Sequence, residues 1–122
     1  MPEVLLIIPG IPRAKGSRSV RRYEQRVREI ALRHFDQPLR QQDLSMEIHH
    51  FYTRGNLLDI DNLQKPILDG LKGAAYDDDG QIDRITAQRY NLSGSYVVED
   101  VREEWADWLE LGGDFVSVLI RF

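Results

Sequence analysis

Segments of strand length alternate with segments of helical period along the chain, and this alternation limits the folds open to it. Apolar runs typical of strands occupy residues 3–8, 44–52, 82–92 and 115–120. Between them, apolar residues recur at helical spacing in residues 20–31, 63–71 and 98–109. Helices that connect strands in this way pack on the faces of one sheet. The sequence therefore predicts an α+β fold, with a mixed β-sheet and packed helices in a single domain of residues 1–122.

Prolines and capping residues set the expected ends of the first two helices. Ser19 is suited to cap the first helix, and Pro38 is expected to stop it. Pro66 inside a helix would lose a backbone hydrogen bond. We therefore expect the second helix to begin near Lys65, where proline is well placed, and to end at Gly73.

The charge of the chain is unevenly distributed. A net charge of −4 would ordinarily argue against a nucleic-acid partner. However, nine basic and four acidic residues give residues 1–40 a charge of +5, and the rest of the chain carries −9. Seven cations and one acid lie between Arg13 and Arg28. This density suits contact with a phosphate backbone, and a solvated helix face is the alternative interpretation.

Several classes of protein are excluded by what the sequence lacks. The absence of cysteine rules out a disulfide framework, a thiolate zinc site and a cysteine nucleophile. The longest apolar run, Val4 to Pro9, is too short to span a bilayer. We therefore expect a cytoplasmic protein with no membrane partner.

Acidic residues near the second helix have the pattern of a metal site. Asp59 and Asp61 are two residues apart, so in an extended segment both carboxylates point to the same side of the backbone. Oxygen ligands of this kind suit Mg²⁺, and a third carboxylate from Asp78 or Asp79 would complete a pocket. Lys65, one helical turn after Asp61, is placed to contact a scissile phosphate.

Each of these acidic features also has a structural explanation. Aspartate often caps helices, and the run Asp-Asp-Asp-Gly at 77–80 is ordinary in turns. The joint occurrence of the carboxylates, the lysine and a separate basic segment favours hydrolysis of a nucleic acid. His49 and His50 are neighbours on a strand and face opposite sides, so they cannot form one metal site.

Three segments resemble the RusA family of Holliday junction resolvases. They are Asp-Ile-Asp-Asn-Leu-Gln-Lys-Pro-Ile-Leu-Asp-Gly-Leu at 59–71, Tyr-Asp-Asp-Asp-Gly-Gln-Ile at 76–82, and the basic segment at 9–18. The resemblance covers roughly residues 4–92. It implies a homodimeric, Mg²⁺-dependent endodeoxyribonuclease that resolves four-way junction DNA. Such an enzyme acts by symmetric phosphodiester hydrolysis in recombination and repair, and is expected in the cytoplasm, associated with the nucleoid, encoded by a bacterium or a phage.

The resemblance also assigns roles to residues of this chain. It implies that Asp59, Asp61 and Asp79 bind the metal, with Asp78 as a weaker candidate, and that Lys65 completes the catalytic set. Mg²⁺ is the expected cofactor, and Mn²⁺ is a possible substitute. The charge pattern adds a set of cations expected to contact DNA: Arg13, Lys15, Arg18, Arg21, Arg22 and Arg26.

Residues 96–113 depart from the family, in which a short hairpin is expected between the last two strands. Here the sequence predicts an acidic helix whose apolar stripe includes Val101, Trp105 and Trp108. Core packing is the simplest explanation of the stripe, and a dimer contact is the main alternative. Two other functions stay open: a non-catalytic protein that binds branched DNA, and a less selective metal-dependent nuclease.

Overall fold

A computed structural model describes residues 2–14, 16–53, 60–93 and 101–122, and only the backbone of Ile60 and Asp61. The elements, with η marking short 3₁₀ helices, are β1 (Glu3–Pro9), α1 (Val20–His34), β2 (Leu44–Tyr52), α2 (Ile60–Leu71), η1 (Asp79–Gln81), β3 (Ile82–Asn91), η2 (Glu103–Trp105), α3 (Ala106–Leu111) and β4 (Phe115–Arg121). No helix in these ranges is long and apolar enough to cross a membrane.

The strands form one four-stranded mixed sheet in the order β1-β4-β2-β3. Strand β4 pairs antiparallel with both β1 and β2, whereas β3 pairs parallel with β2. Helix α2 lies in the crossover between the two parallel strands, as parallel pairing requires. All residues of β4 except Arg121 are buried, because this central strand is covered on both faces. The expected α+β class with a mixed sheet is confirmed.

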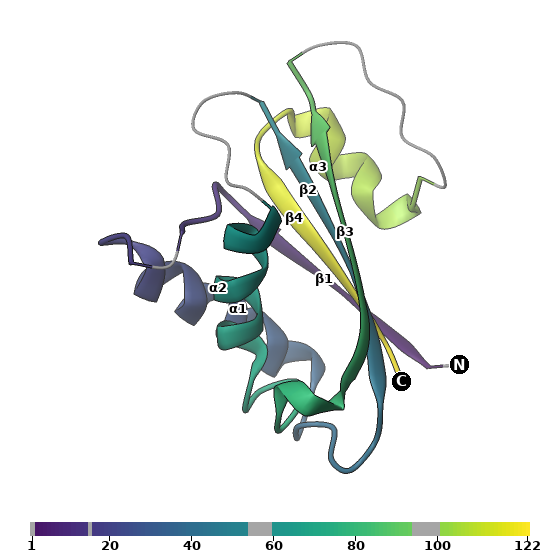
Figure 1. The fold of residues 1–122 in the computed structure, drawn as a ribbon. Helices are drawn as coiled ribbons and strands as arrows, with labels where there is room; N and C mark the ends of the chain where they lie inside the picture. Colours follow the sequence, from purple (N-terminus) through teal and green to yellow (C-terminus); the bar gives the residue numbers. More distant parts are fainter. Residues whose placement is uncertain (1, 15, 54–59, 94–100) are drawn as a thin grey trace.

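Helices cover both faces of the sheet (Figure 1). The main core lies under α1 and α2, where residues such as Val27, Ile48 and Val118 are fully buried. A second cluster of buried aromatic residues lies on the opposite face, beside η2 and α3; it consists of Phe51, Tyr90, Trp105 and Phe115. The two helices that carry the basic residues and the acidic motif therefore share one face.

The acidic segment near the C-terminus differs in part from its prediction. The structure confirms that Trp105 belongs to the core: it is 2% exposed, and its indole N–H donates to the hydroxyl of Ser117 at 2.7 Å. Val101 was expected on the same stripe, but it is 55% exposed and lies before the helical turns. Helix α3 is also shorter than predicted, since it begins at Ala106, and residues 94–100 lie outside the described ranges.

Helix α2 begins earlier than expected. Its first residue is Ile60, so the prediction of a start near Lys65 was wrong, and Pro66 lies inside the helix. A proline there forfeits one backbone hydrogen bond. Leu63, Pro66 and Ile67 are all buried against the core, and burial of this apolar surface offsets the loss.

A close contact fixes α1 to α2. A Cβ atom at Gly70 would lie 2.7 Å from both the carbonyl oxygen of Glu24 and the Cβ of Val27. At the end of α2, the guanidinium of Arg28 donates to the carbonyl oxygens of Asp69 at 3.3 Å and Lys72 at 2.9 Å. Arg28 thus caps the C-terminus of α2. This contact sets where the basic residues of α1 lie relative to the acidic start of α2.

Substituting Gly70 by alanine tests this contact. Alanine improves helix propensity by about 1 kcal/mol, yet overpacking against α1 costs about 1–3 kcal/mol or more, so we expect a net loss of stability. The matched control is Gly113→Ala, because nothing lies within 4 Å of that position. Urea unfolding should show a lower midpoint for Gly70→Ala than for the control. Equal midpoints would contradict the close contact.

Candidate functional site

The segment of residues 77–81 before β3 is held in place by one side chain. The amide oxygen of Gln81 accepts from the backbone N–H of Asp77 at 2.8 Å and of Asp78 at 2.9 Å. Its amide nitrogen donates to the carbonyl oxygens of Leu39 at 3.0 Å and Gln42 at 3.1 Å. Gln81 therefore joins the acidic turn to the segment before β2.

A capping box completes this turn. The carboxylate of Asp78 accepts from the backbone N–H of Gly80 at 3.2 Å, while Gln81 bonds back to the N–H of Asp78. The spacing Asp-x-x-Gln is a known signature of such a box. Sequence reasoning noted Gln81 only within the family motif, although this spacing was a signal for its structural role.

The three consecutive aspartates have different partners. Asp77 lies 3.4 Å from the guanidinium of Arg40, and Asp78 lies 3.7 Å from the ammonium of Lys72. Both pairs are exposed and contribute little stability. Asp79 is exposed, its carboxylate lies 3.0 Å from the hydroxyl of Tyr76, and no cation among the described residues pairs with it. Of the three, Asp79 is thus the one whose carboxylate has no cationic partner among the described residues.

Tyr76 orients Asp79 and places it beside α2. Its hydroxyl also lies 3.1 Å from the carbonyl oxygen of Leu68, in the third turn of the helix. Burial, followed by the nearby Asp79, raises the pKa of Tyr76, so the hydroxyl keeps the proton that it donates. Sequence reasoning did not identify Tyr76 as a partner of Asp79, because nothing in the local pattern shows where its hydroxyl lies.

The remaining acidic residues of the predicted site belong to the start of α2. Asp61 lies in the first turn, where only its backbone is described, and Asp59 falls outside the described residues. Seven residues, or about 10 Å of helix axis, separate Asp61 from Leu68, beside which Asp79 lies. In the described ranges, which omit Asp59 and the Asp61 side chain, no three acidic or histidine residues form a metal-binding group. The three-carboxylate site stays a prediction.

Lys65 is the residue predicted to contact a scissile phosphate, and this role stays a prediction. It lies in α2 four residues after Asp61, on the same helix face, and its side chain is exposed.

The two histidines, His49 and His50, face opposite sides of β2. His50 is buried, and this burial lowers its pKa to about 4, so the ring is neutral and cannot serve as a surface cation.

Most of the predicted DNA-contacting cations are exposed. Five of these arginines are exposed, and together we call them the basic surface: Arg13, Arg18, Arg21, Arg22 and Arg26. Lys15 lies outside the described residues. Two adjacent hollows share Arg22 and Arg26 in their walls, so these cations are gathered on one side of α1. Arg28 is not counted in this surface, because its guanidinium bonds to carbonyl oxygens at the end of α2.

Comparison with known proteins gives one family. The sequence profile of the family described as Endodeoxyribonuclease RusA matches residues 10–99, well over half of the chain. The matched range includes the basic surface, α2 and the turn at 77–81, and it leaves out α3 and β4. No curated protein matches the chain.

Replacing Gln81 by glutamate tests its role in the turn. Glutamate keeps the acceptor oxygens but loses both hydrogen bonds to the carbonyls of Leu39 and Gln42, so we expect a loss of about 1–3 kcal/mol in the free energy of unfolding. Gln42→Glu is the control, because it makes the same charge change on an exposed side chain. Chemical denaturation measures both variants. If both unfold at the same midpoint, Gln81 does not hold the turn.

Proposed function

The chain belongs to the RusA family of endodeoxyribonucleases, and on this premise we propose how its residues cleave a DNA junction. Members of the family are Holliday junction resolvases: they hydrolyse phosphodiester bonds of branched DNA and depend on metal ions. The observation that carries the proposal is the match over residues 10–99, which contains Asp59, Asp61, Lys65 and Asp79.

The metal in this proposal is Mg²⁺, with Mn²⁺ as a substitute, and its ligands are Asp59, Asp61 and Asp79. Carboxylate oxygens are the ligands that such hard cations prefer. Asp79 fits the role because it is exposed, oriented by Tyr76 and not paired with a cation in the described part of the chain. When bound there, Mg²⁺ would stabilise charge on the phosphate and lower the pKa of the attacking water.

The cations of the chain act on the DNA phosphates. Lys65 donates to an oxygen of the scissile phosphate and stabilises the negative charge that builds there. The basic surface, together with Lys15, binds the flanking phosphates and holds the junction in register. The fixed contact of α1 with α2 keeps these two groups of cations at a constant separation.

Two copies of the chain act on one junction in this proposal. The acidic motif occurs once in the sequence, so one copy supplies one site. A four-way junction with twofold symmetry presents two equivalent strands, and a symmetric homodimer presents two equivalent sites to them. Paired, symmetric cleavage follows from this matching of symmetries.

Substituting the proposed ligands tests the site. Asp61→Asn and Asp79→Asn each keep the size of the side chain but remove its charge. We expect each to lower cleavage of a synthetic four-way junction in Mg²⁺ by at least about 100-fold, while junction binding is kept. Cleavage and gel-shift assays on the same junction separate the two effects.

Asp77→Asn is the matched control, because Asp77 lies in the same turn and pairs with Arg40. It should cleave at close to the rate of the unmodified protein. Normal cleavage by Asp61→Asn would refute the assignment of the site. If Asp77→Asn lost activity and Asp79→Asn kept full activity, Asp77 would replace Asp79 as the third metal ligand.

A further inference from the structure

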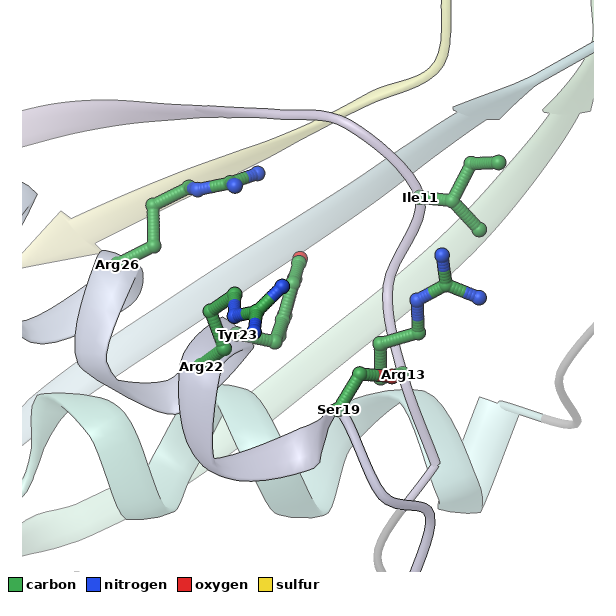
Figure 2. Close-up of a pocket in the computed structure, with 6 residues that line it drawn as sticks. All are labelled: Ile11, Arg13, Ser19, Arg22, Tyr23 and Arg26. Atoms are coloured by element: carbon green, nitrogen blue, oxygen red, sulfur yellow. The ribbon is translucent and has the colours of Figure 1, made fainter.

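A small pocket lies where the loop after β1 passes the start of α1 (Figure 2). Six residues line it: Ile11, Arg13, Ser19, Arg22, Tyr23 and Arg26. Its volume is about 160 Å³. This is smaller than the roughly 300–1,000 Å³ of pockets for drug-sized ligands and several times the roughly 30 Å³ occupied by one water molecule. The pocket therefore suits one small group.

Tyr23 supplies a buried donor to this pocket. Its side chain is 3% exposed, and its hydroxyl has no hydrogen-bond partner among the described residues. Figure 2 shows the hydroxyl pointing into the space bounded by Arg13, Arg22 and Arg26. Burial raises the pKa of Tyr23, so the hydroxyl stays protonated. Buried polar groups in folded proteins almost always have a partner, so this one points to a ligand.

The other polar groups around the pocket are cationic. Within the described part of the chain, no carboxylate forms an ion pair with Arg13, Arg22 or Arg26. One nitrogen of Arg26 donates to the carbonyl oxygen of Pro9 at 3.1 Å, which fixes the side chain and leaves further N–H groups for a ligand. The pocket therefore offers several donors and favours an anion.

The start of α1 adds to this preference. Ser19 occupies the capping position, as the sequence predicted, but its side chain makes no capping hydrogen bond. The first turn of α1 contains no acidic residue. The positive end of the helix dipole is therefore not offset by a carboxylate in its own first turn, and it attracts negative charge to the same place.

We propose that this pocket binds one phosphate group of the DNA backbone, with the Tyr23 hydroxyl and the guanidinium groups of Arg22, Arg26 and Arg13 as donors. The assignment to DNA rests on the proposed function, whereas the binding of a phosphate oxyanion rests on the pocket alone. A phosphate bound in this pocket would fix the position of the junction relative to α1.

The first test uses inorganic phosphate and does not depend on cleavage. Protein with ¹³C-labelled tyrosine rings is titrated with phosphate at constant ionic strength, and the Tyr23 signals are identified by their absence in Tyr23→Phe. We expect a saturating shift of the Tyr23 signals and a loss of affinity of at least about fivefold in Arg22→Gln. Arg33→Gln, an exposed arginine of α1 outside the pocket, should bind phosphate normally. A shift that does not saturate, or that is unchanged in Arg22→Gln, would overturn the proposal.

The second test identifies the source of the phosphate. Affinity for a four-way junction is measured against salt concentration in EDTA, where no cleavage occurs. Removing one phosphate contact with Arg22→Gln should weaken binding and reduce the slope of log K against log salt by about 0.9. Tyr23→Phe should weaken binding at an unchanged slope, since it removes no charge.

The junction measurements, together with a separate cleavage assay in divalent cations, separate the pocket from the proposed function. Junction affinity unchanged in Arg22→Gln and Tyr23→Phe, with phosphate still bound, would assign the pocket to a free phosphate compound and overturn its role in DNA binding. A chain that binds phosphate and junctions as expected but cuts neither strand in any divalent cation would refute the proposed function and leave the pocket supported.

Discussion

The close contact between α1 and α2 at Gly70 fixes the relative positions of the two helices that carry the charged residues. The missing side chain lets the backbone of α1 approach α2 closely, and Arg28 bonds to the carbonyl oxygens of Asp69, near the end of α2, and of Lys72, just after it. The two helices carry the two charge groups of the molecule, cations on α1 and Asp61 with Lys65 on α2. A metal-dependent nuclease needs both groups at a fixed separation, because the phosphates that flank a scissile bond are themselves regularly spaced. The close packing of two helices on one sheet face provides that rigidity.

The turn at residues 77–81 shows how a run of acidic residues is accommodated. Three neighbouring carboxylates repel one another, and the structure gives each a different partner: Arg40 for Asp77, Lys72 for Asp78 and the neutral hydroxyl of Tyr76 for Asp79. Gln81 holds the backbone beneath them. Within this turn, Asp79 is the residue whose charge no cation in the described ranges neutralises, and this is why we propose it as the metal ligand. The same reasoning applies to the pocket at the start of α1, where donors without acceptors indicate a negatively charged ligand.

Hydrophobic patterning and the order of the elements predicted the four strands, the mixed sheet and α1. Helix α1 and strand β2 each bury one regular face, and β4 is a short apolar run buried on both faces. The patterning did not predict the start of α2, because there the rule that proline disrupts a helix conflicts with burial of an apolar helix face. Pro66 argued for a late start of α2, but the buried face of the helix outweighs one lost hydrogen bond. The sequence also could not show that Arg28 caps α2 whereas Arg22 lines a pocket, because both are cations in the same run. The partners of Tyr76 and Tyr23 depend on contacts between distant segments, and no local pattern shows them.

We propose that this chain cuts four-way junctions in preference to other DNA, and a panel of DNA substrates tests this preference. The purified protein is incubated with Mg²⁺ and equal amounts of a four-way junction, a flap and a linear duplex of the same sequence. We expect paired nicks at symmetric positions in two strands of the junction, with little cleavage of the linear duplex. Equal cleavage of all three substrates would contradict it in favour of a less selective nuclease. Junction binding without cleavage in either Mg²⁺ or Mn²⁺ would contradict it in favour of a non-catalytic binding protein.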